Sequence, residues 1–362
     1  MKVLLINQEK TPHYRVAVYS YLSHYLSRRG YKLTVVSEGT QDGSCHAADF
    51  EHQVRHLNFF SVAALIFKVN PDVLIYWVRL RHLYLFPVLI LLKLLGKKAV
   101  YWGHGSDLLK TTAIAFRRFA NRIEYQISDA LVLYSTHQLG KVSERFHYKT
   151  FIANNTLSFQ HHSGRFAPKG ETLTRYEITT PRNIICVGRM QKRKRIDHLV
   201  QAHRLLKTKD VGVIFVGPDT ENVLEQVNGP GIYKLGEVYG DRLLDLLYAA
   251  DVFCIPGAVG LSIVDAFYCG LPLVTEEGDA SPEMMYLKQN VNGFVVPRGN
   301  IPELAAKLDL LLSDGSLRDR FSAAAKEEIG TNGHIDRMSE GFLAALDYVS
   351  GRKAVMLQSS AA

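Results

Sequence analysis

Short apolar runs of strand length alternate with segments of helical periodicity along this chain, and the alternation begins twice. In the first half, the helical segments are Val16–Leu26 and Tyr84–Leu95. The apolar runs are Lys2–Ile6, Lys32–Val36, Val73–Tyr76, Ala99–Trp102 and Leu131–Leu133. Apolar strands separated by amphipathic helices predict a doubly wound, mostly parallel sheet with helices on both faces.

The second half repeats this pattern. Its predicted strands are Asn183–Val187, Val213–Val216, Gly231–Leu235, Val252–Ile255, Leu271–Thr275 and Gly293–Val296. Its predicted helices include Asp197–Leu206, Arg242–Ala249 and Ile263–Phe267. The sequence therefore predicts an α/β protein of two Rossmann-like domains in tandem.

The domain boundary is predicted between Ser158 and Arg182, where His, Ser, Gly, Pro, Lys and Thr dominate as in a linker. We expect an N-terminal domain over residues 1–165 and a C-terminal domain over residues 175–334. A helix over residues 335–350 follows the completed second domain, so we expect it to return and pack on the first. Residues 351–362 form a tail.

Positive charge is concentrated in the N-terminal half. Residues 1–170 contain 22 Lys and Arg against 10 Asp and Glu, a net charge of +12, whereas residues 171–362 contain 21 against 25, a net charge of −4. This asymmetry would attract nucleic acid, anionic lipid head groups or a phosphorylated substrate. An ordinary solvated surface explains it equally well.

The compartment is predicted from what the sequence lacks. Met1–Ile6 is too short for the core of a signal peptide, and the apolar stretch Leu83–Leu95 is shorter than the roughly 20 residues needed to cross a bilayer. No paired spacing links the four cysteines, which are Cys45, Cys186, Cys254 and Cys269. We expect buried thiols in a reducing, cytoplasmic protein.

Two motifs in the second half suggest a phosphate site. Gly188 and Arg189 end the first strand of that half, and a run of cations from Lys192 to Arg195 precedes a helix. Cations at the carboxyl end of a strand, beside a helix N-terminus, favour a bound phosphate, although a solvated basic loop is the alternative.

The second motif is the glycine-containing segment from Pro256 to Ala266, where a strand again leads into a helix. Its glycines allow backbone amides to approach a ligand. Asp265 lies between apolar neighbours one turn into the helix, so its carboxylate needs a partner, for which a ribose diol is one candidate. The alternative is a surface Asp favoured by the helix dipole.

These motifs, VGRMQKRKRIDHLVQA and PGAVGLSIVDAFYCGLPLVT, resemble the nucleotide-sugar domain of the retaining glycosyltransferases of family four, which have the GT-B fold. FVG at Phe215–Gly217, YKLGEV at Tyr233–Val238 and EMMYLKQNVNGFVVP at Glu283–Pro297 extend the resemblance. It implies two Rossmann-like domains that face each other across a cleft, the first binding the acceptor and the second the nucleotide-sugar.

The resemblance also implies roles for individual residues. Arg189 and Lys194 would clamp the diphosphate of the donor and stabilise the departing charge, and Asp265 would bind the ribose. The implied nucleotide-sugar site also contains Gly188, Gly217, Leu235, Gly260 and Leu261.

One position departs from the family signature of Glu, seven residues, Glu. Asp265 occupies the second position, whereas the first falls on Gly257, or on no residue if the loop is shortened. In the family, the first Glu contacts the hydroxyls of the donor sugar, so this departure affects how the sugar is recognised.

In the first domain, His104 follows a predicted strand between Gly103 and Gly105. A single histidine at a strand end fits a structural or a functional role. The resemblance implies that it faces the transferred sugar. It also places the loop with Pro12, Tyr14 and Arg15 beside the acceptor, where Arg15 would bind a phosphate of the acceptor or donor.

The predicted enzyme needs no cofactor and no metal. The sequence contains no DxD motif and no metal-ligand spacing of His or Cys. The diphosphate charge would be balanced by Arg189, Lys194 and helix-end amides. We expect front-face attack, with the diphosphate itself accepting the proton of the acceptor, because no pair of flanking acids is visible.

The expected substrates are a UDP- or GDP-sugar and a glycan or lipid-linked acceptor in cell-surface polysaccharide synthesis. Peripheral contact with the anionic inner face of the cytoplasmic membrane is expected from the basic first half. The supporting cations are Arg79, Arg81, Lys93, Lys97, Lys98, Arg117, Arg118 and Arg122. A sugar-nucleotide epimerase and a catalytically impaired partner subunit are the alternatives. Nucleic-acid binding is not expected, because aromatic side chains do not alternate with the cations.

Overall fold

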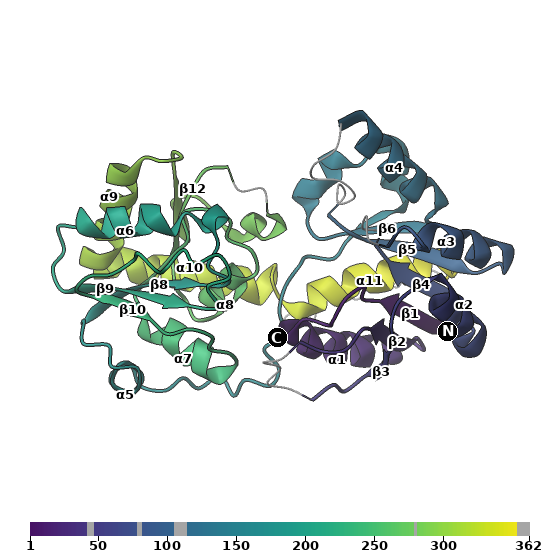
Figure 1. Ribbon diagram of the computed structural model, residues 1–362, viewed down its shortest axis with the longest axis horizontal. Coiled ribbons are helices and arrows are strands. Elements are labelled where there is room, and N and C mark those ends of the chain that lie inside the picture. The colour runs from purple at the N-terminus through teal and green to yellow at the C-terminus, as the bar shows by residue number, and fades with distance from the viewer. Residues whose placement is uncertain (42–46, 78–81, 105–113, 279–280, 353–362) are drawn as a thin grey trace. The chain divides into compact units, whose positions relative to one another are not determined.

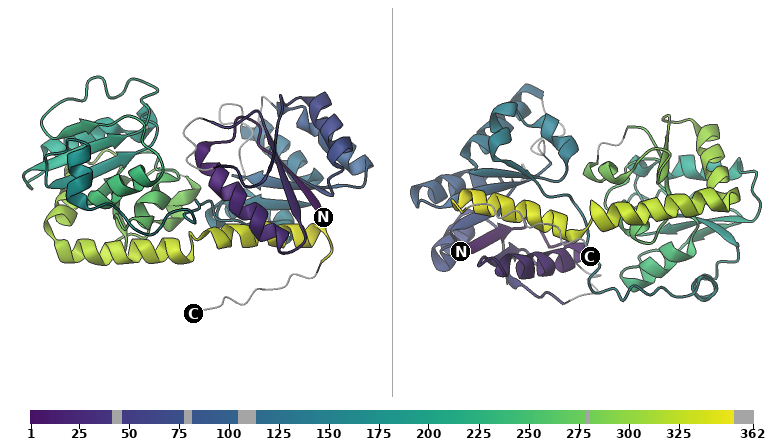
Figure 2. Two further views of the ribbon diagram at one scale, coloured as in Figure 1. Left: turned by 90° about the horizontal axis from the view of Figure 1, so that it is seen from below. Right: turned by 180° about the vertical axis from the view of Figure 1, so that it is seen from behind.

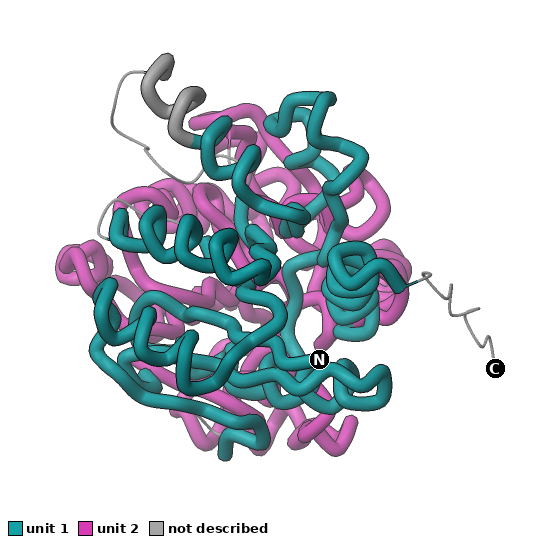
Figure 3. The backbone as a smooth tube through the Cα atoms, turned by 90° about the vertical axis from the view of Figure 1, so that its right-hand side faces the viewer, with its two compact units in different colours: residues 1–158, 335–362 teal, residues 159–334 magenta. Residues whose placement is uncertain are grey.

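The computed structural model describes residues 1–41, 47–77, 82–104, 114–278 and 281–352, with the backbone alone for residues 114–120 (Figure 1). Cys45, Arg79, Arg81 and Gly105 lie outside the described residues, as do the side chains of Arg117 and Arg118. The chain forms two compact units, shown in two colours in Figure 3. Unit 1 contains Met1–Ser158 and the C-terminal segment from Ile335, and unit 2 contains Phe159–His334.

Unit 1 is built on a parallel sheet of seven strands in the order β3-β2-β1-β4-β5-β6-β7. The strands are β1 (Lys2–Ile6), β2 (Lys32–Ser37), β3 (Glu51–Val54), β4 (Val73–Tyr76), β5 (Lys98–Gly103), β6 (Ala130–Leu133) and β7 (Thr150–Ile152). Strands β1, β4, β5 and β6 are almost wholly buried because helices cover both faces of the sheet.

Two apolar cores fill the two faces of this sheet. On one face, α1 (His13–Ser27) and α11 (Ile335–Val349) lie side by side (Figure 2). On the other face are α2 (Phe59–Val69), α3 (Leu85–Leu94) and the end of α4 (Ile114–Ile127). Short 3-10 helices, η2 (Thr136–Lys141) and η3 (Glu144–Lys149), lead into β7.

Helix α11, the last helix of the described chain, belongs to the core of unit 1. Phe342 and Leu346 are fully buried, and the Phe342 ring lies edge-on to Trp102 with centroids 5.0 Å apart. Gly341 allows the close approach, since a Cβ atom there would lie 2.1 Å from the carbonyl oxygen of Ile152. The C-terminal helix thus completes the unit that the N-terminal residues begin.

Unit 2 contains a parallel sheet of six strands in the order β10-β9-β8-β11-β12-β13. The strands are β8 (Arg182–Val187), β9 (Val211–Val216), β10 (Ile232–Lys234), β11 (Val252–Cys254), β12 (Leu273–Glu276) and β13 (Gly293–Val296). The strand order reverses between β8 and β11, which is where open sheets of this type bind ligands.

The helices of unit 2 contact one another in a continuous series. Helices α6 (Ile196–Arg204) and α9 (Ile301–Ser313) contact each other. Helix α7 (Asp241–Ala249) contacts both α5 (Lys169–Arg175) and α8 (Ser262–Tyr268), and α10 (Gly315–Thr331) joins α9 to α8. Two short 3-10 helices, η4 (Lys192–Lys194) and η5 (Pro282–Tyr286), lie in loops that follow β8 and β12.

The two units divide at Ser158, and the linker-like segment that follows it packs on unit 2. Phe159 stacks on Tyr268 with ring centroids 3.9 Å apart, and Phe166 stacks on Tyr248 at 4.4 Å. Helix α5 lies within the segment, where Lys169 also pairs with Asp251. Two aromatic contacts, the packing of α5 on α7 and this ion pair attach the segment to unit 2.

The cysteine prediction is confirmed for three residues, since Cys186, Cys254 and Cys269 are buried free thiols. No helix within the described ranges is long and apolar enough to cross a membrane.

Candidate functional site

Two glycine turns bring the ends of β8 and β9 together in unit 2. Gly188 and Gly217 have φ angles of 125° and 132°, which favour glycine. The Gly188 N–H donates to Val216 at 2.9 Å, and a Cβ atom on Gly217 would lie 2.3 Å from the Gly188 carbonyl oxygen. The two turns therefore pack closely against each other at the carboxyl edge of the sheet.

Lys194 holds its ammonium group against these turns. The residue is 4% exposed, and its Nζ donates to the carbonyl oxygen of Ala258 at 3.1 Å. A Cβ atom on Gly188 would lie only 3.1 Å from that Nζ, so glycine is what allows the approach. A largely buried ammonium at the carboxyl edge of a sheet is a strong attractor for an anion.

Arg189 follows Gly188 and is exposed. Its guanidinium forms no hydrogen bond or ion pair with any described residue. The structure thus provides one fixed and one available cation at the edge of the sheet, as a phosphate clamp requires.

The backbone of η4 is tied to the loop that follows β11. The Gly257 N–H donates to the Lys194 carbonyl at 2.9 Å, and the Ala258 N–H donates to the Arg193 carbonyl at 3.0 Å. A Cβ atom on Gly257 would lie 2.1 Å from the Arg193 carbonyl oxygen. The position assigned to the first Glu of the family signature therefore has no room for a side chain.

Asp265 lies in α8, between the fully buried Val264 and Ala266. The residue keeps some exposed surface, but its carboxyl group is withdrawn from water, and this desolvation raises its pKa to about 7. No hydrogen bond or ion pair from the described part of the chain reaches this carboxyl. It is suited to accept hydrogen bonds from a ligand.

The other predicted nucleotide-sugar residues lie along the same edge. The Leu235 N–H donates to Phe215 at 3.0 Å, and the Gly217 N–H donates to Gly236 at 2.6 Å, which joins the ends of β9 and β10. Gly260, with φ 68°, and Leu261 lead into α8. The structure therefore brings all the predicted residues of unit 2 to the carboxyl ends of four adjacent strands.

The predicted residues of unit 1 lie at the carboxyl edge of its own sheet. His104 follows β5, where its ring is edge-on to Tyr134 with centroids 4.4 Å apart. Its Nδ1 is 3.1 Å from Nε2 of Gln138, whose Oε1 accepts from the Tyr134 N–H at 3.2 Å. Since Gln138 thus presents its amide hydrogens, His104 accepts at Nδ1 and carries its own proton on Nε2 when neutral.

Arg15 differs from the expectation of a phosphate-binding loop cation. It is 6% exposed, its Nη2 donates to Oδ1 of Asn155 at 2.5 Å, and its guanidinium lies 5.2 Å from the Trp102 ring centroid. The stacking and the hydrogen bond hold the group inside unit 1. Pro12 is partly buried, whereas Tyr14 is 39% exposed.

The sequence analysis missed a buried charge cluster at the end of β12. Glu276 is 1% exposed and accepts from Arg195 Nη1 at 2.7 Å, from the Gly299 N–H at 3.0 Å, and pairs with His198 Nδ1 at 2.6 Å. Burial opposes ionisation of this carboxyl, but the hydrogen bonds from His198 and Arg195 outweigh it and lower its pKa. The signal available in the sequence was an acid at the carboxyl end of an otherwise apolar strand.

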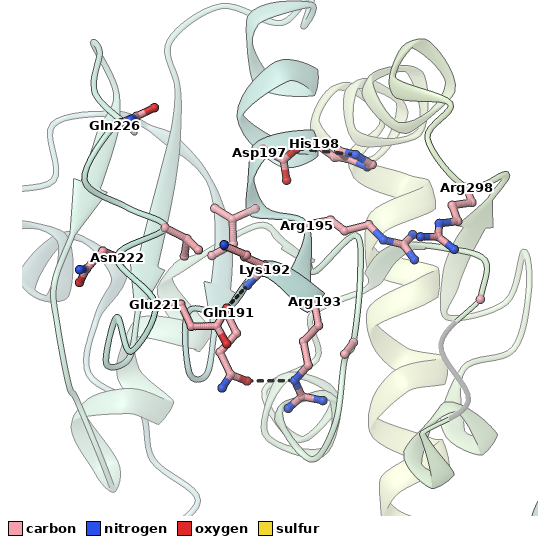
Figure 4. Close-up of a pocket in the computed structure, with 14 residues that line it drawn as sticks. Gln191, Lys192, Arg193, Arg195, Asp197, His198, Glu221, Asn222, Gln226 and Arg298 are labelled. Atoms are coloured by element: carbon pink, nitrogen blue, oxygen red, sulfur yellow. Dashed lines mark hydrogen bonds and ion pairs between the residues drawn. The ribbon is translucent and has the colours of Figure 1, made fainter. Parts of the chain in front are cut away.

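Arg195 and His198 also line a pocket of about 910 Å³ beside η4 (Figure 4). Further lining residues are Gln191, Lys192, Arg193, Glu221, Gly278 and Arg298. The wall is rich in cations, which extends the positive region next to Lys194. Within the described ranges, no three His, Cys, Asp or Glu side chains converge as metal ligands would.

Residues 173–328 match the family model of the glycosyl transferases group 1. The matched segment lies within unit 2, and it is this part of the chain that is similar to the family. Over 149 residues it is 28% identical to the sulfoquinovosyl transferase SQD2 of Arabidopsis thaliana, covering 40% of this chain and 29% of that protein. Over 127 residues it is 32% identical to a phosphatidyl-myo-inositol mannosyltransferase of Mycobacterium leprae, covering 33% of each. The matches span about a third of the length of these relatives.

Solved glycosyltransferase structures resemble nearly the whole chain. A glycosyltransferase from Rickettsia africae superimposes with a TM-score of 0.77 and 17% identity, over 96% of this chain and 98% of that chain. Anabaena HepE, solved in complex with UDP, gives a TM-score of 0.76 and 14% identity, over 96% and 100%. At these identities the likeness shows the fold, which is the GT-B fold of two parallel Rossmann-like sheets.

Proposed function

We propose that this protein is a metal-independent, retaining glycosyltransferase that uses a nucleoside diphosphate sugar as donor. The proposal rests on the Lys194 ammonium, which is buried against Gly188 at the carboxyl edge of the unit 2 sheet. Arg189, whose guanidinium pairs with no described residue, lies next to Gly188 in the chain. An anionic ligand bound there would compensate a charge that the fold has already removed from water.

The remaining residues of unit 2 account for the rest of the nucleotide. Asp265, whose carboxyl lacks a partner among the described residues, would accept hydrogen bonds from the ribose hydroxyls. Gly217 and Leu235 would line the base. The complex of HepE with UDP supports a uridine nucleotide, and a guanosine nucleotide is the second choice to test.

The reaction would form a bond between an acceptor hydroxyl oxygen and the anomeric carbon of the sugar. The bond from that carbon to the diphosphate oxygen breaks, and the nucleoside diphosphate leaves with the electron pair. The acceptor proton passes to a diphosphate oxygen on the same face, so the configuration is retained. Arg189 and Lys194 stabilise the negative charge that develops on the leaving group.

His104 would face the transferred sugar from unit 1. Its neutral tautomer, fixed by Gln138, presents an N–H that can donate to a sugar hydroxyl. Pro12, Tyr14 and Arg15 would border the acceptor, with Tyr14 offering the exposed surface and Arg15 supporting the loop from within.

The acceptor is proposed to be a glycan or a lipid-linked sugar of cell-surface polysaccharide synthesis, approached at the cytoplasmic face of an anionic membrane. Helices α2 and α3 expose large apolar side chains: Phe60 is 81% exposed, Phe67 62%, Ile90 56% and Leu94 81%. Exposed apolar side chains among lysines suit an interfacial contact. Lysines of the same segments are Lys68, Lys93, Lys97 and Lys98.

Vesicle flotation tests the membrane contact. Wild type should float with vesicles that contain anionic phospholipid and remain free of vesicles made of zwitterionic lipid alone. The double variant Phe67→Ser, Leu94→Ser should lose flotation, whereas the control Leu205→Ser, an exposed leucine of unit 2, should keep it. Equal flotation of both variants would remove these helices from the proposal.

The function is tested in two stages. A thermal-shift screen without added metal compares UDP, GDP, ADP and their sugar conjugates, because a ligand that binds only the native state raises the melting temperature. The nucleotide-sugar that binds is then incubated with membrane lipid extract, and transfer of the labelled sugar is measured. No shift with any nucleotide contradicts the proposal. Binding without transfer would instead favour an impaired partner subunit, a reading that the absence of space at Gly257 supports.

A further inference from the structure

Arg195 occupies a backbone conformation that is unusual for a long side chain. Its φ and ψ angles are 52° and 48°, in the left-handed region that favours glycine. It ends η4, where its N–H donates to Lys192, and it immediately precedes α6. A glycine would satisfy this turn with less strain, so the side chain of Arg195 needs an explanation.

The Arg195 side chain connects the turn to the carboxyl end of β12. Its guanidinium is 17% exposed and reaches the buried carboxylate of Glu276 at 2.7 Å. Glu276 is fixed in turn by the strand pairing of β12 with β13 and by its own N–H, which donates to Pro256 at 3.1 Å. Figure 4 shows Arg195 pointing away from Lys192 in the direction of Arg298.

Lys194 lies between the Arg195–Glu276 ion pair and a second set of contacts, made with Gly257 and Ala258. On one side, its carbonyl accepts from the Gly257 N–H and its ammonium donates to Ala258. On the other side, Arg195, the next residue in the chain, forms an ion pair with Glu276. The turn is thereby attached to three strands, β8 through the chain itself, β11 through Gly257, and β12 through Glu276.

We propose that Glu276 and Arg195 are positioning residues that hold Lys194 in the orientation that binds the diphosphate of the donor. The inference rests on the proposed function, because it assigns a purpose to the placement of Lys194. Glu276 does not touch the donor in this arrangement. It acts through Arg195 and the backbone of η4.

Two substitutions remove the connection in different ways. Arg195→Gly removes the side chain and leaves a residue that suits the left-handed turn. Glu276→Gln keeps the shape of the side chain but removes the charge that holds Arg195. Arg204→Ala is the control, since Arg204 is an exposed arginine at the far end of α6 and has no ion pair in the described structure.

The first measurement compares the affinities of each variant for UDP and for uridine, or for GDP and guanosine if the screen selects guanine. Arg195→Gly and Glu276→Gln should each weaken binding of the diphosphate about tenfold and leave the nucleoside within twofold of wild type. Arg204→Ala should change the diphosphate affinity less than threefold. An equal loss for nucleotide and nucleoside would indicate a merely structural role and overturn the inference.

The double variant Arg195→Gly, Glu276→Gln separates a shared role from two independent ones. If Glu276 acts through Arg195, the double variant should bind the diphosphate no more weakly than Arg195→Gly alone. Losses that multiply to about a hundredfold would show that Glu276 acts by another route and would contradict the proposal.

Amide hydrogen exchange gives a readout that needs no nucleotide. In Arg195→Gly, the Gly257 and Ala258 amides, which donate to Lys194 and Arg193, should exchange at least tenfold faster than in wild type. Unchanged exchange overturns the inference even if wild type binds UDP and Lys194→Ala does not. If wild type binds no nucleotide, the proposed function fails, and this exchange measurement still decides whether Arg195 holds the turn.

Discussion

The two sheets of this protein share a parallel Rossmann-like topology, but different kinds of residue follow their strands. In unit 2, a glycine with positive φ follows every strand within six residues. These glycines are Gly188, Gly217, Gly236, Gly260, Gly278 and Gly299. Among the described residues that follow the strands of unit 1, only Gly39, after β2, has this conformation.

At the carboxyl edge of the unit 1 sheet, buried polar and aromatic side chains take the place of such glycine turns. Gln8, after β1, is fully buried, and neither of its amide atoms has a partner in the described structure. Trp102 is also buried, with Arg15 over its ring and no hydrogen-bond partner for Nε1 among the described residues. Such unsatisfied groups are uncommon in folded proteins and concentrate at functional sites.

Under the proposed function, the contrast explains how one architecture would serve two kinds of ligand. A diphosphate is the same in every nucleotide-sugar, so backbone turns and one fixed cation can recognise it. An acceptor varies, and variable recognition requires side chains that can be exchanged without changing the fold. We therefore expect substitutions at the strand ends of unit 2 to affect nucleotide binding, and substitutions of Pro12, Tyr14 and Arg15 in unit 1 to affect the acceptor.

The largest effect should come from filling the space at Gly257. In Gly257→Ala, the new Cβ atom would meet the Arg193 carbonyl, and the hydrogen bonds that hold η4 would have to separate. We expect unit 2 to lose about 3 kcal/mol of stability, measured by urea unfolding, and nucleotide binding to fall at least a hundredfold.

Gly260→Ala is the control for this variant. A Cβ atom at Gly260 would meet no atom within 4 Å, and only its positive φ makes the substitution unfavourable. It should cost about 1 kcal/mol. Equal destabilisation by the two variants would show that the close packing at Gly257 has no special role.

Removal of the two cations should have the next largest effect. Lys194→Ala and Arg189→Ala should each weaken nucleotide-sugar binding by about 1.5 to 3 kcal/mol, as expected for charge-assisted hydrogen bonds. Titration calorimetry measures the affinity. Arg204→Ala, at the far end of α6, is the control and should bind normally. Normal binding by both Lys194→Ala and Arg189→Ala would remove the phosphate assignment.

A substitution of Arg15 tests the role of unit 1. Arg15→Ala removes the hydrogen bond to Asn155 and the stacking on Trp102, so kcat/KM for transfer should fall about 20-fold, equivalent to roughly 2 kcal/mol. The nucleotide affinity should stay within twofold of wild type. Arg15→Lys should be intermediate, since an ammonium keeps the charge without the planar group. A similar loss of nucleotide affinity in Arg15→Ala would contradict the assignment of Arg15 to the acceptor side.

The sequence predicted the regular elements well where apolar runs were continuous. Strands Val73–Tyr76 and Gly293–Val296 are confirmed to the residue. It missed β3, whose residues Glu51–Val54 are half exposed at the edge of the sheet and have no apolar pattern. It also missed α2, although Asn58 and Ser61 form a reciprocal cap at its start.

The candidate site was predictable only in part. Sequence motifs placed Lys194 and Asp265 in the segments that follow strands. The roles of these two residues in binding the nucleotide-sugar stay predictions. The partner of Arg195 was not predictable, because Glu276 lies 81 residues away and meets it only through the order of strands in the sheet. Nor could composition show that Gly257 has no space for a side chain, since that depends on the path of η4.

The smallest expected effect concerns the pH dependence of nucleotide binding through Asp265. Desolvation raises the pKa of this carboxyl to about 7, above its ordinary value of 3.8, so its ionisation as the pH rises through 7 removes stability from the free protein. Ribose hydroxyls that donate to the carboxylate would favour ionisation and lower the pKa in the complex. The affinity for a nucleotide-sugar, whose diphosphate has no terminal group titrating near pH 6, should therefore rise about tenfold between pH 6 and pH 8.

Asp265→Asn should abolish this rise, as measured by calorimetry. A rise that persists in Asp265→Asn would show that another group titrates and that the ribose contact has been assigned to the wrong residue.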